Sequence, residues 1–167
     1  MKSEFMANSA CCGTVVFVRR GVQLESVADL QGKRLAVGAE GSGTRVVVKR
    51  LLAENGIAAD NATLLDIAAD ELVTALASGS IDSAFLIGGA NSELISALAT
   101  HENVSLLGLR RAAAYARRAS YLSKVVLPEG VLNLQVNEPS VDTETVAVTA
   151  MLTVREDLHP AISDLVM

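Results

Sequence analysis

The sequence predicts an α/β fold with a mostly parallel sheet flanked by helices. Apolar runs rich in β-branched residues alternate with segments of helical periodicity, and this alternation is typical of parallel sheets. Half of the 167 residues are hydrophobic, which is enough to enclose one core. The sequence contains neither internal repeats nor low-complexity tracts, so we expect one compact domain.

The predicted strands are the runs in which valine, leucine and isoleucine dominate. Continuous apolar runs of this kind are expected of strands that are buried on both faces. The candidates are residues 14–18, 34–38, 63–67, 83–87, 104–109 and 145–154.

Three helices are predicted between these strands, each with a recognisable start or stop signal. The first stops at Gly56, and the second has Asp70 as its expected N-cap and Gly79 as its stop. The third begins at Asn91 or Ser92, where a side chain can cap the first free amides. The three helices cover residues 43–56, 69–80 and 91–104.

The last third of the chain contains a basic segment and then a long connection. Arg110, Arg111, Arg117 and Arg118 recur at a seven-residue spacing that would place them on one helix face. A solvated face is the expected role, and contact with a partner protein or an anionic ligand is the alternative. Residues 121–145 contain two prolines and several turn formers, so we expect a long connection over the surface.

Composition excludes several classes of partner. The net charge is −5, from 14 Lys and Arg against 19 Asp and Glu, so the long-range field repels nucleic acid and anionic lipid. Only 3% of residues are aromatic and tryptophan is absent, which removes the usual stacking platforms. No apolar run reaches the roughly 18 residues of a membrane span. The adjacent Cys11 and Cys12 suit neither a disulfide nor a zinc site. A small polar or charged ligand fits this composition best.

A glycine-rich turn between a predicted strand and a predicted helix is the strongest candidate site. Gly41-Ser42-Gly43-Thr44 would leave unpaired N–H groups where the helix dipole favours negative charge, and its two hydroxyls add donors. These features suit a carboxylate or a phosphate, although the turn could also simply cap a helix. A second turn, Gly88-Gly89, follows another predicted strand. We expect both turns at the same carboxyl edge of the sheet, facing one crevice.

Motifs of nucleotide-binding proteins and of enzymes are not matched. A P-loop needs lysine after its last glycine, where this sequence has Thr44 and Arg45, and the dinucleotide fingerprint needs glycine where Val46 stands. We therefore expect neither a cofactor nor a metal, and no enzyme activity. The histidines and scattered carboxylates are expected to be structural, caps or solvated charges. They include His101, His159, Asp66, Asp70, Glu71 and Asp82.

The order of several short motifs resembles the TAXI family of TRAP-transporter solute receptors, which are type II periplasmic solute-binding proteins. The succession "DLQGKRLAVG", "GSGTR", "ALASGSIDSAFLIGG" and "VREDLHP" matches over about residues 14–160. Such receptors have two α/β lobes joined by crossing strands, with a small molecule clamped between them. The resemblance implies that this chain holds one lobe of the fold with its long hinge strands.

The resemblance also implies a division of the chain, a site and partners. Residues 1–13 would be a leader or linker, 14–160 the ligand-binding lobe, and 161–167 the truncated start of a further helix. The second lobe would lie outside this chain. A small organic anion such as an amino acid or carboxylate would be delivered to TRAP-type membrane subunits in the periplasm or another extracytoplasmic space, with possible membrane tethering of the full-length protein. The expected ligand-binding residues are Gly41, Ser42, Gly43, Thr44, Arg45, Gly88, Gly89 and Asn91.

Other proteins share this two-lobed architecture, so alternatives stay open. They are an ABC-type substrate-binding protein, the effector-binding domain of a LysR-like transcription regulator, and a transferase or other enzyme built on the same lobes. Many TAXI receptors carry an aromatic residue in the late connection, and the segment after Pro128 has none, which leaves the ligand open.

Overall fold

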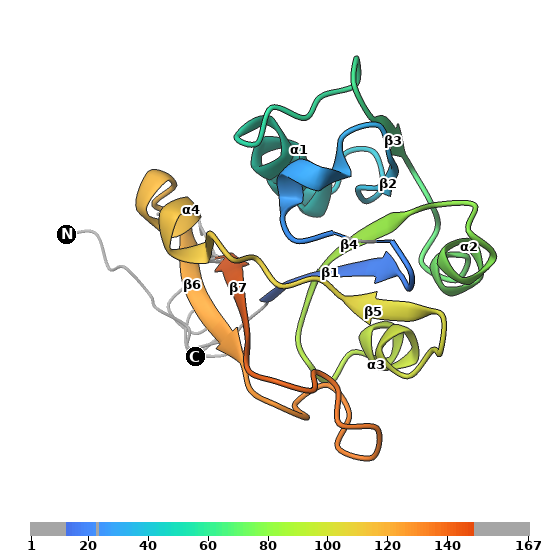
Figure 1. The fold of residues 1–167 in the computed structure, drawn as a ribbon. Coiled ribbons are helices and arrows are strands. Elements are labelled where there is room, and N and C mark those ends of the chain that lie inside the picture. The colour runs from blue at the N-terminus through green and yellow to red at the C-terminus, as the bar shows by residue number, and fades with distance from the viewer. Residues whose placement is uncertain (1–12, 23, 149–167) are drawn as a thin grey trace, which may run out of the picture.

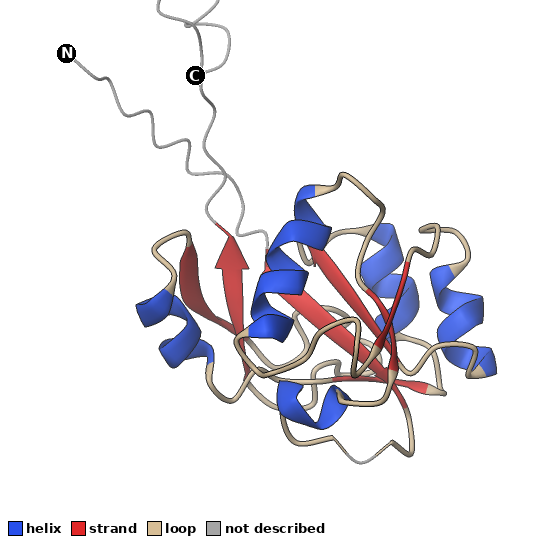
Figure 2. Cartoon of the chain, turned by 90° about the horizontal axis from the view of Figure 1, so that it is seen from above, coloured by secondary structure: helices blue, strands red, loops and turns tan. Residues whose placement is uncertain are grey.

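The computed structural model describes residues 13–22 and 24–148, and it shows a mixed sheet with helices on both faces (Figures 1 and 2). The strand order is β3-β2-β4-β1-β7-β6, with β5 also paired to β1. The strands are β1 Gly13–Arg19, β2 Arg34–Ala36, β3 Thr63–Leu65, β4 Ser83–Gly88, β5 Val104–Leu106, β6 Leu122–Leu127 and β7 Thr143–Val148. The helices are η1 Val27–Leu30, α1 Gly43–Ala53, α2 Leu72–Ser78, α3 Glu93–Ala99 and α4 Ala112–Arg118.

The α/β class is confirmed, whereas the expectation of a mostly parallel sheet is wrong. Only β2–β3 and β2–β4 pair in parallel, and β1 is antiparallel to β4, β5 and β7. The helical crossovers do leave β2 to β5 running in one direction, as the alternating pattern predicted. However, β1 lies between β4 and β5 and runs the opposite way, so the central pairings become antiparallel.

The two faces of the sheet carry two separate hydrophobic cores. Along β1, Val16 and Val18 belong to one core while Val15 and Phe17 belong to the other, because successive side chains of a strand point to opposite faces. The first core is completed by η1, α1 and α4, and the second by α2 and α3. All four of these β1 side chains are at most 4% exposed, so β1 is the central element of the lobe.

All six predicted strands are present within the described residues, and a seventh was missed. Residues 122–127 of the expected surface connection form β6, which pairs antiparallel with β7 from Leu122↔Val148 to Leu127↔Thr143. β6 is an edge strand of the sheet, and Leu122 is its only buried residue. It therefore lacks the continuous apolar run of a central strand. The last six residues of the candidate 145–154 lie outside the described part of the chain.

The helix boundaries were predicted with mixed success. Gly79 ends α2 in the left-handed conformation and Ser92 is the N-cap of α3, as expected. Glu71, not Asp70, occupies the N-cap of α2, and α1 ends at Ala53 before the predicted stop at Gly56. The four arginines predicted to share one helix face do not do so, because α4 begins at residue 112 and Arg110 and Arg111 precede it. All four are exposed.

Candidate functional site

The two glycine-rich turns follow neighbouring strands that run in the same direction. In the β2–β4 pairing, Leu35 lies beside Ser83 and Ala36 beside Ala84. The carboxyl ends of both strands therefore point to the same edge of the sheet, and each leads into a turn that opens a helix. This is the placement expected from the sequence.

The first turn is held in a shape that requires glycine at its start. Gly38 has φ +90°, a conformation that L side chains rarely adopt. A Cβ at Gly38 would lie 3.1 Å from Ser42 Oγ and 3.2 Å from Thr44 Cβ, so the turn folds closely over its own backbone. Gly41 is also left-handed, with φ +78°. By contrast, a Cβ at Gly41 or at Gly43 would meet nothing within 4 Å.

Ser42 caps α1, yet two amides at the helix start remain free. Ser42 Oγ accepts a hydrogen bond from the amide of Arg45 at 3.2 Å, and the Ser42 carbonyl accepts one from Val46 at 3.4 Å. Within the described ranges 13–22 and 24–148, the amides of Gly43 and Thr44 have no hydrogen-bond acceptor. The capping interpretation is thus correct for Ser42, and Gly43 and Thr44 retain the donors that an anion would need.

Two charged side chains brace the first turn from either side. Arg45 Nη1 donates to the carbonyl of Gly38 at 2.9 Å, so this guanidinium holds the loop backbone. Asp66 Oδ2 accepts a hydrogen bond from the amide of Glu40 at 3.0 Å. The sequence interpretation had treated Asp66 as an ordinary cap or solvated charge. Its position directly after β3, the third strand with its carboxyl end at this edge, was the signal that could have identified it.

The second turn is tightly packed rather than open. A Cβ at Gly89 would lie 2.8 Å from Asn91 Oδ1, and one at Gly88 would lie 3.3 Å from Ile95 Cδ1. The Ser92 amide donates to the Gly89 carbonyl at 3.0 Å, which closes the turn before α3. Both neighbours are the ends of side chains, and the Asn91 amide lies close to the turn backbone.

The first and last described strands meet at the same edge as the second turn. Gly13, the first residue of β1, pairs with Gly88 on one side and with Ala147 of β7 on the other. The chain therefore enters β1 and leaves β7 beside the Gly88-Gly89 turn. Two strands that cross this edge side by side are the arrangement expected of hinge strands.

The clearest hollows in the surface lie elsewhere, around Arg110. One of about 400 Å³ is lined by Gly108, Arg110, Asp142, Thr143 and Glu144, and another of about 490 Å³ by Glu25, Ser26, Asp29, Arg110 and Arg111. None of the predicted ligand-binding residues lines either hollow. The predicted site therefore coincides with neither of these two hollows.

The described residues contain neither a metal-binding cluster nor a membrane-spanning helix. No group of three or more His, Cys, Asp or Glu side chains there is arranged to hold a metal ion. No helix in the same part of the chain has the length and hydrophobicity needed to cross a bilayer.

Comparison with protein families gives one match that spans most of the chain. A family model described as the NMT1-like family matches residues 12–163. Among solved structures, the chain is similar to the periplasmic aliphatic sulphonate-binding protein SsuA from Escherichia coli, with 14% identity over 83% of this chain and 37% of that one, at a TM-score of 0.49.

Two other solved structures are comparably similar. The alkanesulfonate-binding protein SsuA from Xanthomonas axonopodis pv. citri, bound to MOPS, is 26% identical over 66% of this chain and 40% of that one, with a TM-score of 0.48. An ancestral arginine-binding protein bound to arginine is 17% identical over 83% of this chain and 47% of that one, with a TM-score of 0.45. The chain spans less than half the length of each of these three proteins.

Proposed function

Because the chain belongs to the NMT1-like family, we propose that it forms one lobe of a solute-binding protein that clamps a small organic anion against a second lobe. The observation that carries this proposal is the pair of glycine-rich turns at the carboxyl ends of the adjacent parallel strands β2 and β4. Ligands of open α/β sheets bind outside the carboxyl ends of the strands. The adjacent ends of β1 and β7 supply the two hinge connections.

The ligand carboxylate would bind at the start of α1. Its oxygens would accept hydrogen bonds from the free amides of Gly43 and Thr44, in the direction that the helix dipole favours. The Ser42 hydroxyl accepts the Arg45 amide with its oxygen and keeps its proton for donation to the same anion. Open space over Gly41 and Gly43 lets the ligand approach the backbone closely.

A positive group on the same ligand would find a partner in Asp66. One carboxylate oxygen of this residue accepts the Glu40 amide, and the other stays available beside the turn. A carboxylate next to an anion cradle disfavours a ligand with two negative groups and favours a zwitterion. Amino acids are therefore the preferred ligand class, ahead of simple mono- and dicarboxylates.

Function would consist of binding and lobe closure, without covalent chemistry. We assign the full protein to an extracytoplasmic space, where it would deliver its ligand to TRAP-type membrane subunits, as the motif order suggests. An ABC-type substrate-binding protein is the second candidate, since the same edge of the lobe would serve either transporter class equally.

Ligand-detected NMR with matched compounds tests the proposal. Propionate is alanine without its amino group, and ethylamine is alanine without its carboxylate. Ethanesulfonate has a sulfonate in place of the carboxylate of propionate. We expect saturation transfer to alanine, less to propionate and none to ethylamine. Absence of transfer to every anion, both with this chain and with the protein carrying both lobes, would refute a solute-binding role.

A further inference from the structure

The connection between β6 and β7, residues 128–142, is an ordered loop with its own hydrogen-bond network. The Gly130 amide donates to the Pro139 carbonyl at 2.8 Å, and the Asn133 and Glu138 amides donate to each other's carbonyls at 3.0 and 2.9 Å. Asn137 Nδ2 donates to Glu129 Oε1 at 2.7 Å. Leu132 is only 5% exposed and packs into the core beside α2 and α3, so it anchors the loop to the lobe.

This ordered loop displays apolar side chains to solvent. Six large hydrophobic residues are exposed within the described part of the chain, and five of them lie in residues 126–141. Leu134 is 87% exposed and Val136 is 55% exposed, and both lie in the turn that the Asn133–Glu138 bridge encloses. Figure 1 shows the whole loop below β6 and β7. The others are Val126, Val131 and Val141. A preorganised apolar loop loses little conformational entropy on binding, which is the property of a docking element.

The charges around this loop define the surface that it fits. The loop itself, residues 128–142, contains no lysine or arginine, while Glu129, Glu138 and Asp142 lie within it. Glu144, beside the loop, is paired with Lys124, and Arg20 lies near Glu138. A surface that is apolar at its tip and acidic around it is complementary to one that is basic with an apolar centre. The same acidic rim repels an anionic membrane.

A basic surface with one exposed apolar residue at its end is present on the same chain, at α1 and α4. Neither helix contains an acidic residue, and together they expose Lys49, Arg50, Arg117 and Arg118. The helices are joined by a hydrogen bond from Tyr115 to Asn55 at 2.8 Å and by the Arg118–Glu54 ion pair at 2.7 Å. We call these four cations the basic face. The sixth exposed large hydrophobic residue, Val46, lies one helical turn from Lys49 and Arg50 and is 68% exposed.

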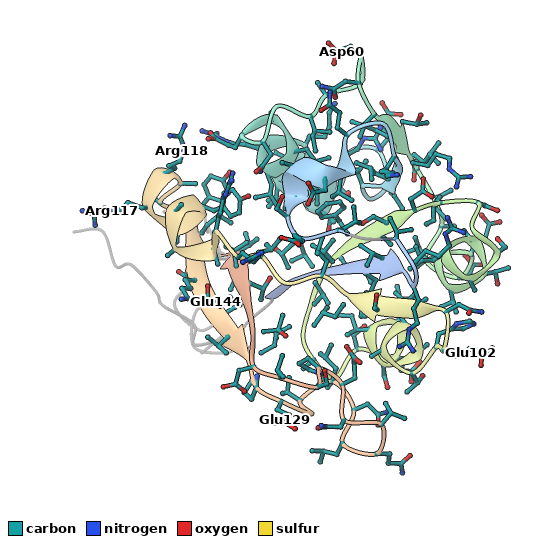
Figure 3. The ribbon with its side chains drawn as sticks, in the orientation of Figure 1. Asp60, Glu102, Arg117, Arg118, Glu129 and Glu144 are labelled. Carbon is teal, nitrogen blue, oxygen red and sulfur yellow. The ribbon has the colours of Figure 1, made fainter. Side chains whose placement is uncertain are left out.

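We propose that the 128–142 loop of one copy docks on the basic face of a second copy of this chain. Leu134 and Val136 would pack around Val46, and the acidic residues beside the loop would face the lysine and arginines. In Figure 3, Glu129 lies at the bottom of the view, whereas Arg117 and Arg118 lie at the upper left, so the loop and the basic face are separate surfaces of one copy. The two surfaces differ, which makes the contact heterologous.

Sedimentation velocity over a range of protein concentrations tests this proposal. We expect wild-type protein to self-associate reversibly and more weakly in high salt. The loop variant Leu134→Ser/Val136→Ser and the face variant Lys49→Glu/Arg117→Glu should each associate at least tenfold more weakly, with unchanged circular dichroism. Lys33→Glu is the charge-matched control for the single variants Lys49→Glu and Arg117→Glu, because Lys33 lies outside both surfaces, and it should behave as wild type.

Mixing the two variants separates this contact from every symmetric one. The face variant keeps an intact loop and the loop variant keeps an intact basic face, so their mixture should associate although neither does alone. A wild-type protein that stays monomeric at all concentrations overturns the proposal. It is equally overturned if the face variant associates as wild type, which would indicate loop-to-loop packing, or if the mixture stays monomeric.

Discussion

Replacing Gly43 by alanine should stabilise the fold and weaken ligand binding at the same time. Gly43 is the first residue of α1, its φ lies outside the left-handed region, and an added Cβ would meet nothing within 4 Å. Alanine at such a position stabilises by about 0.4–1 kcal/mol, mainly because it restricts the unfolded chain. For a chain of this length that corresponds to a rise in Tm of about 1–4 °C.

The same methyl group would occupy the open space through which an anion approaches the free amides. An anion at a helix start gains about 0.3–2 kcal/mol, so losing that contact should weaken binding roughly 2- to 30-fold. Calorimetric titration and thermal unfolding of the same samples measure the two effects. A variant that gains stability and binds the ligand as tightly as wild type would refute the site, because the turn would then only cap a helix.

Gly41→Ala is the matched control for this experiment. Its added Cβ also meets nothing within 4 Å, but Gly41 has φ +78°, where an L side chain costs about 1–2 kcal/mol. This variant should lose stability where Gly43→Ala gains it. Both added methyl groups enter the open space over the turn, so both variants should bind the ligand more weakly although their stabilities change in opposite directions. Weaker binding in both would show that obstruction, and not backbone strain, lowers the affinity.

Three further predictions concern the stability of the lobe. Gly38→Ala should cost about 2–3 kcal/mol in denaturant unfolding, because it adds left-handed strain and displaces the Ser42 cap; a loss under 1 kcal/mol would contradict this account. Hydrogen bonds from Arg34 lower the pKa of Asp82, so Asp82→Asn should lower the free energy of unfolding by about 2–3 kcal/mol at pH 7. The difference from wild type should shrink as the pH falls below the ordinary pKa of 3.8, because the wild-type carboxylate then becomes protonated. A difference that does not depend on pH would contradict this prediction. Burial raises the pKa of Glu138, so Glu138→Gln should unfold at a higher denaturant concentration than wild type at pH 7. Below pH 4.5 the wild-type carboxyl is protonated, and the two proteins should unfold at the same concentration. Equal stability at both pH values would contradict this prediction.

The sequence predicted the number and order of most elements because continuous apolar runs and glycine stops are local signals. It could not reveal the direction of β1, since a buried strand has the same composition whichever way it runs. It also missed β6, where Lys124 and Ser123 interrupt the apolar pattern because the strand borders the sheet. Orientation and edge position are properties of tertiary packing, which a single segment does not encode.

The placement of the two glycine turns at one sheet edge was predicted, but their internal contacts were not. Strand, glycine turn and helix occur consecutively in the sequence, so the free amides at Gly43 and Thr44 could be anticipated. The brace from Asp66 to Glu40 joins residues that are 26 positions apart, and only the parallel β2–β3 pairing brings them together. The hydrogen bond from Arg45 to the Gly38 carbonyl could not be predicted either, and the expected role of Arg45 in ligand binding stays a prediction.

A ¹H–¹⁵N NMR titration of the chain with amino acids and small carboxylates tests the central claim most directly. The account predicts saturable shifts at the amides of Gly41 to Thr44, largest for Gly43 and Thr44, with smaller shifts at Gly88 and Gly89. Shifts that are confined to the hollows around Arg110, or a titration of the two-lobed protein that leaves the amides of Gly43 and Thr44 unchanged, would contradict it.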